Sequence, residues 1–459
     1  MGYQITGRGE NVLSQTTTHC ERLFLSPLTS FQKLLALKRY VIPRLLFQLR
    51  IRKFFRRDLG RLDARIRTLV KAEFRLPNRA CQPFFHAGLA VGSLGIPNIC
   101  CEADGFRVTQ AVKMANAIDG SVRAVARGRL AHLARRAIRS AETTRPLTVE
   151  YLNGIVPEGS VARPPGSACE LFAEMRLASR RLGVTWSLSS EGNYVVAIGP
   201  DCCVDSAKIT KFIHTRVNAR WRSRWEGLPD QGKTVSCQGR YGCSNDFLRT
   251  STVLTAVESS WLLKARLNLL PLRSIRRRFT NRVEPSVVCC KCGQYNETLP
   301  HVLNHCPRVM ESITNRHNSV LGVLLDFSSR HLFSRLDVDR VCREHATLTN
   351  QIQRPDLIVE DDKTVLVIDV ARPFGNGVAS LDEAVAWKRS KYAALCDSMR
   401  KATSKRVELH TFVVGSLGSY CPGTAATLRA LGVTGHAAKL AARRAAAVAR
   451  RGSHRVWKA

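Results

Sequence analysis

The feature that most constrains how this chain folds is a pair of apolar, β-branched runs on either side of a short polar break at residues 360–363. Such runs around a charged break predict an antiparallel hairpin. With the turn centred between Asp362 and Lys363, Asp356 and Asp369 lie directly opposite each other. Directly opposed residues have Cβ atoms about 5 Å apart, so the hairpin brings two carboxylates together.

Two carboxylates at this separation repel each other strongly in an apolar setting unless a cation lies between them. Mg²⁺ is the usual cation, bound by one or two carboxylates together with phosphate oxygens. Asp356 and Asp369 therefore predict a catalytic, Mg²⁺-binding site that cleaves phosphodiester bonds.

A lysine that completes this site is expected on a helix. Nuclease sites of the PD-(D/E)xK type carry a lysine two residues after the second acid, where this chain has Ala371. Residues 381–395 follow helical spacing, and Lys388 falls in the middle of their apolar face. A lysine there needs an anionic partner, so Lys388 is the predicted catalytic lysine, with Tyr392 one turn later. The alternative is a lysine that snorkels to solvent, which suits Lys391 better.

A second group of residues has the types and the short first spacing of a tetrahedral Zn²⁺ site. The predicted ligands are Cys289, Cys292, His301 and Cys306. Eight residues between the two pairs are too few for a ββα finger, which needs about twelve, so a structural zinc knuckle is expected. His305 could replace Cys306, and Cys290 could compete with Cys289.

The charge of the chain favours a polyanionic partner. Its 459 residues include 71 lysines and arginines against 36 acids, a net charge of +35. This excess favours nucleic acid through counterion release, although a membrane surface would also attract it. No segment approaches the roughly 18 unbroken apolar residues of a membrane span, and no signal-peptide pattern is present. The 16 cysteines are therefore expected as reduced thiols and metal ligands.

The amino-terminal third is predicted to be basic and helical. Residues 28–49 form an amphipathic run with Pro43 as a break, and a second helical stripe covers residues 59–69. Between them, cations interleave with aromatic residues, which predicts a surface that tracks phosphates; a solvated helix face is the alternative. The nucleic-acid-binding residues predicted here are Arg50, Arg52, Lys53, Arg56 and Arg57.

The middle of the chain has weaker signals. Residues 92–97 predict a tight turn, and residues 143–167 a linker zone. A strand is predicted at residues 194–199. Helices are predicted at residues 111–133, 168–182 and 248–270, and residues 437–451 predict a basic surface helix or a frayed end.

The order of these parts resembles the carboxy-terminal half of the open reading frame of site-specific non-LTR retrotransposons that carry a reverse transcriptase and a restriction-like endonuclease and insert into ribosomal RNA genes. The weaker matches, to the end of the polymerase palm, the thumb and the post-thumb region, are residues 2–7, 32–34, 41–44, 85–87 and 92–97. The more specific matches are the zinc pattern with Glu297-Thr298-Leu299-Pro300-His301 inside it, Arg316-His317-Asn318, Arg354-Pro355-Asp356, Asp369, Lys388-x3-Tyr392 and residues 412–418.

The resemblance implies a multidomain α and α/β fold class, and nucleic-acid contacts by Arg316 and His317. The domains expected are the end of the palm and the thumb of a reverse transcriptase at 1–78, a helical post-thumb region at 79–150, a mostly helical linker at 151–285, a Cys-Cys-His-Cys zinc knuckle at 286–310 and a restriction-endonuclease-like α/β domain at 311–459.

The resemblance also implies target-primed reverse transcription in the nucleus. A metal-dependent endonuclease nicks target DNA, and the new 3′ end primes copying of the element's RNA. The polymerase half is not expected here, because no Tyr/Phe-Ala-Asp-Asp signature is present and the nearest echo, Glu102-Ala103-Asp104-Gly105, lacks the second acid. We therefore expect a truncated copy or a fragment. The alternative function is a catalytically inactive, nucleic-acid-binding remnant of a truncated retroelement.

Overall fold

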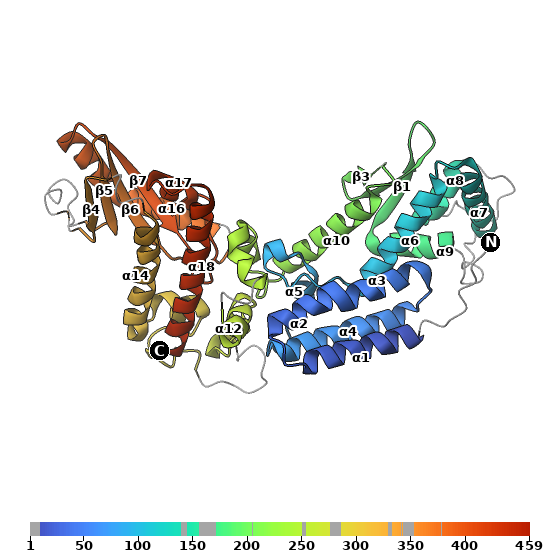
Figure 1. Ribbon diagram of the computed structural model, residues 1–459, viewed down its shortest axis with the longest axis horizontal. Helices are drawn as coiled ribbons and strands as arrows, with labels where there is room; N and C mark the ends of the chain where they lie inside the picture. Colours follow the sequence, from blue (N-terminus) through green and yellow to red (C-terminus); the bar gives the residue numbers. More distant parts are fainter. Residues whose placement is uncertain are drawn as a thin grey trace. The chain divides into compact units, whose positions relative to one another are not determined.

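The computed structural model describes residues 10–138, 145–155, 171–203, 205–249, 254–275, 286–328, 333–340, 342, 353–377 and 379–459. These residues form many helices and two small sheets (Figure 1). The expected mixture of helical and α/β parts is thereby confirmed. The palm match at residues 2–7 and most of the linker zone lie outside the described residues, as do parts of the helices predicted at 168–182 and 248–270.

The chain divides into two compact units. The first contains residues 1–28, 33–70 and 96–221, and the second contains residues 29–32, 71–95 and 222–459. Each unit draws on separate stretches of the chain, so neither is one continuous segment. Among the described residues, no helix combines the length and apolar character that crossing a membrane requires.

The first unit has a large core in which five helices pack with an antiparallel sheet. The helices are α6 (Ile99–Ala115), α7 (Gly120–Ile138), α8 (Arg145–Asn153), α9 (Leu171–Leu182) and α10 (Ile209–Glu226). The sheet order is β1 (Val184–Leu188), β2 (Tyr194–Ile198) and β3 (Asp201–Cys203). Only β2 was predicted from the sequence. β3 was missed because it has only three residues. β1 was missed because Thr185 and Ser187 interrupt its apolar residues, whereas those of β2 are continuous.

The predicted amphipathic runs at residues 28–49 and 59–69 form the helices α2 (Ser30–Ala36), η1 (Leu37–Val41), α3 (Ile42–Ile51) and α4 (Arg56–Glu73). The helices α1 (Glu10–Leu25) and α10 were not predicted from the sequence. At the predicted break, Pro43 lies in the first turn of α3, and the wider π-helical turn η1 precedes it. A proline lacks the N–H that would bond one turn back, and a π turn keeps the chain helical there.

The second unit contains a four-stranded sheet in the order β4 (Arg335–Val338), β5 (Leu357–Glu360), β6 (Thr364–Ala371) and β7 (Arg406–Val413). The first three strands are antiparallel, and β7 runs parallel to β6. The crossover between β6 and β7 is the helix α16 (Ala379–Ala402). Parallel neighbours require such a crossover.

Helices cover both faces of this sheet. Side chains of α16 pack on one face with Val365 and Val367. The other face, with Leu366 and Ile368, packs against α14 (Met310–Phe327), α17 (Thr424–Ala430) and α18 (Gly435–Lys458). α14 and α18 lie side by side (Figure 1). Because helices cover both faces of the sheet, the strands are apolar on both faces.

Shorter elements complete the second unit. They are α5 (Pro83–His86), η2 (Leu89–Val91), α11 (Val235–Gln238), η3 (Gly242–Leu248), α12 (Ala256–Arg266), η4 (His301–His305) and η5 (Pro307–Val309). The turn predicted at residues 92–97 is present. Gly92 and Gly95 have φ of +87° and +63° there, a conformation that favours glycine.

Candidate active site and metal centre

Asp356 and Asp369 lie together at one end of the β5–β6 hairpin. Leu357 pairs with Ile368 in the antiparallel hairpin. Extending this register by one residue places Asp356, which precedes Leu357, opposite Asp369, which follows Ile368. The predicted hairpin register is confirmed. Asp369 shares its face of β6 with Val367, because side chains alternate along a strand. That face is the one covered by α16.

α16 brings Lys388 and Tyr392 to the same place. The Lys388 ammonium lies 2.5 Å from Asp369 Oδ2, with 16% of the lysine side chain and 2% of the aspartate side chain exposed. The Tyr392 hydroxyl donates to the Arg354 carbonyl at 3.0 Å. Lys391 is exposed on the rim of the helix, and its ammonium donates a hydrogen bond to the Tyr392 hydroxyl at 3.0 Å.

Asp356 also contacts α14. Its Oδ1 lies 2.9 Å from His317 Nε2, and its Oδ2 accepts a hydrogen bond from the Val370 amide at 2.6 Å. His317 was expected to contact nucleic acid, but its ring lies against the candidate active site. The histidine therefore belongs with the two aspartates.

Arg316 was also expected to contact nucleic acid. Its side chain is only 2% exposed, and its guanidinium donates to Ser453 Oγ at 2.7 Å and to Asn304 Oδ1 at 2.9 Å. A group buried in this way joins α14, α18 and η4 and does not face solvent. A direct nucleic-acid contact by Arg316 does not fit this arrangement.

The two carboxyl groups share an environment that disfavours negative charge. Burial raises the pKa of Asp356, and the Val370 amide opposes the shift. Burial also raises the pKa of Asp369, and the charge of Asp356 raises it further, against the effect of Lys388. A divalent cation between the two carboxylates would relieve both effects. As two anionic oxygen ligands they fit Mg²⁺, which is commonly held by one or two carboxylates.

The second candidate centre is a Cys/His cluster that can hold a metal ion such as zinc. One ligand atom from each of its members lies within 4.8 Å of all the others. The members are Cys289, Cys292, His301 and Cys306. These are the four ligands predicted from the sequence. Among the described residues, neither Cys290 nor His305 belongs to the cluster.

The distances within the cluster suit tetrahedral zinc. A Zn–S bond of about 2.3 Å separates two sulfurs by about 3.8 Å in a tetrahedron, and a sulfur from a nitrogen by slightly less. The sulfurs of Cys289 and Cys306 are 4.0 Å apart, and Cys292 Sγ is 3.4 Å from His301 Nε2. Donors at these separations surround a space of the right size for Zn²⁺.

The loop that carries the first two cysteines is fixed by hydrogen bonds. The Cys289 amide donates to the Tyr295 carbonyl at 2.7 Å, and Gly293 takes a φ of +68° directly after Cys292. Backbone amides, first that of Gln294, lower the pKa of the Cys292 thiol to about 6. A thiolate is the form that binds metal, so the backbone favours the ligand state.

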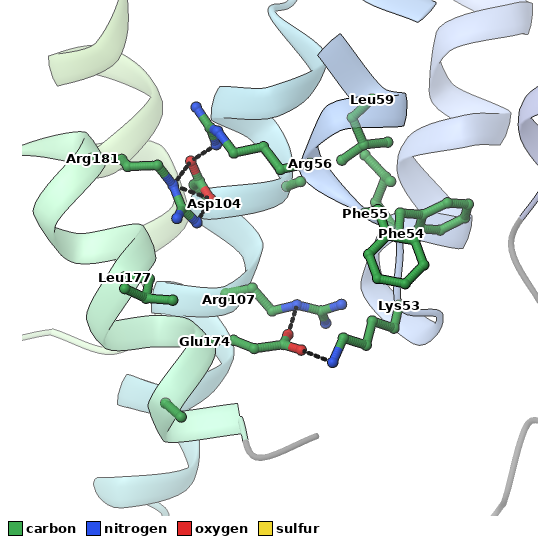
Figure 2. A pocket seen from close by; sticks show the side chains of 13 residues that line it. Lys53, Phe54, Phe55, Arg56, Leu59, Asp104, Arg107, Glu174, Leu177 and Arg181 are labelled. Carbon is green, nitrogen blue, oxygen red and sulfur yellow. Dashed lines mark hydrogen bonds and ion pairs between the residues drawn. The ribbon is translucent and has the colours of Figure 1, made fainter. Parts of the chain in front are cut away.

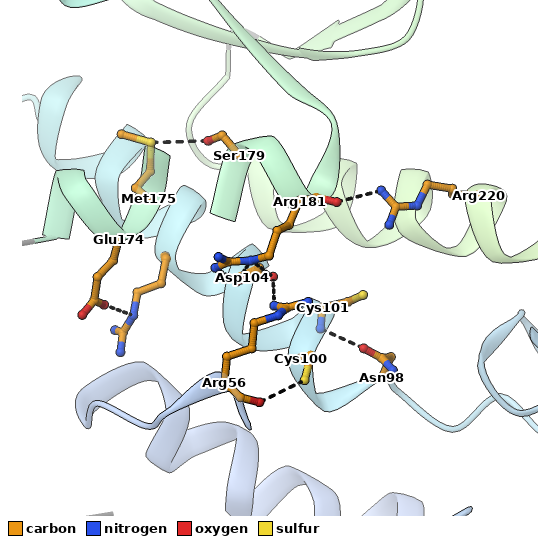
Figure 3. A network of polar contacts seen from close by, with 11 residues as sticks. Arg56, Asn98, Cys100, Cys101, Asp104, Glu174, Met175, Ser179, Arg181 and Arg220 are labelled. Carbon is orange, nitrogen blue, oxygen red and sulfur yellow. Dashed lines mark hydrogen bonds and ion pairs between the residues drawn. The ribbon is translucent and has the colours of Figure 1, made fainter. Parts of the chain in front are cut away.

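Most of the predicted phosphate-binding cations in the first unit already have partners. Arg56 and Arg181 both pair with Asp104, the latter at 2.5 Å, so that Asp104 lies between two guanidinium groups (Figure 3). Lys53 lies 3.0 Å from Glu174. Arg56 and Lys53 are therefore held by acids of α6 and α9.

The side chains of the other three predicted cations differ in their exposure and in their contacts. The Arg50 guanidinium lies over the Phe106 ring, 4.6 Å from its centre. The Arg52 side chain is half-buried. Arg57 exposes 76% of its side chain and has only a loose contact with the neighbouring Asp58, at 3.6 Å. Arg57 is the predicted cation with the freest access to a phosphate.

Sequence reasoning missed the partners of several of these residues. His317 and Asp356 are 39 residues apart, and Arg181 and Asp104 are 77 residues apart. No local pattern links residues at such separations. Scans against family models and curated proteins give no match for this chain. The likeness to retrotransposon proteins therefore depends on the motifs alone.

Proposed function

We propose that this chain is a Mg²⁺-dependent DNA endonuclease with its active site at Asp356, Asp369 and Lys388. One observation carries the proposal: the hairpin opposes the two aspartates where α16 delivers a buried lysine to one of them. Carboxyl groups with raised pKa values tend to cluster at functional sites. The buried aspartates at this end of the sheet therefore support a functional role.

Each residue has a distinct role in this proposal. Asp356 and Asp369 would hold the Mg²⁺, which when bound activates water and offsets charge on the leaving oxygen. Lys388 stabilises the negative charge that develops on the scissile phosphate. His317 orients Asp356 through their 2.9 Å contact. Tyr392 positions the turn of α16 that carries Lys388, through its hydrogen bond to the Arg354 carbonyl.

The Cys/His cluster is proposed as a structural Zn²⁺ site. Protein donors fill all four positions, which leaves no position for a reacting water. Cys306 ends the short helix η4 that carries His301, and α14 begins a few residues later. The metal would thereby fix the start of the helix that carries His317.

The partners proposed are target DNA within ribosomal RNA genes and the RNA of the element, in the nucleus. Both are implied by the resemblance of the motifs, and the net charge of +35 supports a nucleic-acid partner of either kind. The second candidate function, a nucleic-acid-binding remnant without catalysis, has the same charge in its favour and differs in having no cleavage.

The test is nicking of a supercoiled plasmid that carries ribosomal DNA, with Mg²⁺ and with EDTA. We expect nicking with Mg²⁺ only, and none by Asp356→Ala. This variant should still bind DNA, because removing a carboxylate from a basic protein does not weaken its hold on a polyanion. Binding without nicking by the wild-type chain would favour the inactive remnant. Cleavage that persists in EDTA would exclude the proposed site.

A further inference from the structure

The first unit contains a cavity of about 290 Å³ that the proposed cleavage does not use. Figure 2 shows its walls: α9 carries Glu174 and Arg181 on one side, and the segment between α3 and α4 carries Phe54 and Phe55 on the other. Its volume lies just below the roughly 300–1,000 Å³ typical of small-molecule sites. A ligand that fills it is about as large as one nucleotide.

Part of the lining of the cavity is apolar and aromatic. Leu49, Leu59 and Leu177 line it together with the two phenylalanines. Phe55 is 68% exposed, and Phe54 is half-buried. A large exposed ring beside a cavity gains little from packing within the protein. It is available to stack on a flat ligand.

The charged part of the lining carries more positive than negative charge. Its cations are Lys53, Arg56, Arg107 and Arg181, and its acids are Asp104 and Glu174. Each acid holds two cations: Arg56 and Arg181 at Asp104, and Lys53 and Arg107 at Glu174, the last pair at 3.1 Å. Each group keeps one positive charge in excess. The acids orient the cations without neutralising them, which prepares them for an anion.

We propose that this cavity binds one unstacked nucleotide, with its base against Phe54 and Phe55 and its phosphate against the cations held by Asp104 and Glu174. Single-stranded nucleic acids are bound in this way, by aromatic rings that stack on bases beside a positively charged groove. The inference rests on the nucleic-acid partner of the proposed function but not on cleavage, and it is tested in EDTA.

The first test locates the base. The full-length protein is irradiated with a single-stranded oligothymidylate that carries one 5-iodouracil, which crosslinks to a ring stacked on it. We expect the adduct on Phe54 or Phe55. An RNA oligonucleotide and a free uridine nucleotide, each with the same base, distinguish DNA, RNA and mononucleotide as the source. Adducts from all three that map only to other residues would overturn the proposal.

The second test measures affinity by fluorescence anisotropy. Phe55→Leu keeps an apolar side chain but removes the ring, and should weaken single-strand binding on the order of 10-fold with duplex binding unchanged. Phe47→Leu is the control, because Phe47 is similarly exposed, at 60%, but does not line the cavity. Equal effects of the two changes, or none from Phe55→Leu, would contradict the proposal.

A gain of affinity gives the sharpest test. Glu174→Gln leaves its two cations without their acid, so single-strand binding should become several-fold tighter and its salt dependence steeper. Glu191→Gln is the matched control, because it changes the total charge equally at an exposed position outside the cavity. A merely structural role of Glu174 predicts no gain. Binding that is unchanged by Glu174→Gln, or strengthened equally by Glu191→Gln, would overturn the assignment.

Discussion

Lys388 interrupts the otherwise apolar, buried face of α16 and meets a single acid, Asp369. If it stabilises charge in the transition state, Lys388→Ala should lower the nicking rate by roughly 100-fold or more, the scale of removing one such group. Tyr392→Phe should cost less. Single-turnover rates at saturating DNA measure both effects. Arg389→Ala is the control, because it removes one positive charge at an exposed position of the same helix; a wild-type rate for Lys388→Ala would instead make Lys388 a snorkelling lysine.

Lys38, in the π turn η1, allows a prediction about pH. Burial lowers its pKa from 10.5 to about 8. Between these values the unfolded chain binds more protons than the folded one, so stability rises with pH there. The cost of burying this charge is therefore fully present below about pH 8 and absent above about pH 10.5.

We expect Lys38→Met to stabilise the first unit near neutral pH, by roughly 1–3 kcal/mol once solvent screening is allowed for. The gain should shrink as the pH rises from about 8 toward 10.5. Thermal unfolding of both proteins across this range measures it. If the gain does not change with pH, burying the charge of Lys38 does not lower the free energy of unfolding, which would contradict this prediction.

At the scale of elements, the residues of the loop at 286–298 include only two buried ones, Cys289 and Glu297. Their folding energy should come largely from bound metal. We expect about one Zn²⁺ per chain in protein purified without chelator, measured by elemental analysis. His301→Ala should lose the zinc and His305→Ala should keep it, since only His301 belongs to the cluster. Zinc-free wild-type protein would contradict this account.

The hairpin, the zinc ligands and the lysine of α16 could be predicted because each depends on spacing within a short segment. The β5–β6 register follows from where the polar break lies, and the position of Lys388 follows from helical periodicity. Contacts across long separations could not be predicted. The pairing of Arg56 with Asp104 and that of His317 with Asp356 arise only once the helices have packed.

At the scale of the whole molecule, the net charge of +35 predicts binding that weakens steeply with salt. Arg57→Ala should reduce the slope of log affinity against log salt by about one unit for duplex DNA, the loss of one phosphate contact. Arg406→Ala is the control, because Arg406 is as exposed, at 79%, but pairs with Glu408 at 2.8 Å in the second unit. An unchanged slope for Arg57→Ala would make this arginine part of a solvated face.

The central claim, that the opposed aspartates form a Mg²⁺-dependent nuclease site, is tested most directly by comparing two substitutions within one hairpin. Asp369→Asn removes a buried carboxylate of the site, and Asp362→Asn makes the same change at the exposed turn. The measurement is the initial rate of Mg²⁺-dependent plasmid nicking at equal DNA occupancy. We predict no detectable nicking by Asp369→Asn and a near wild-type rate for Asp362→Asn. Nicking that survives Asp369→Asn would contradict the account.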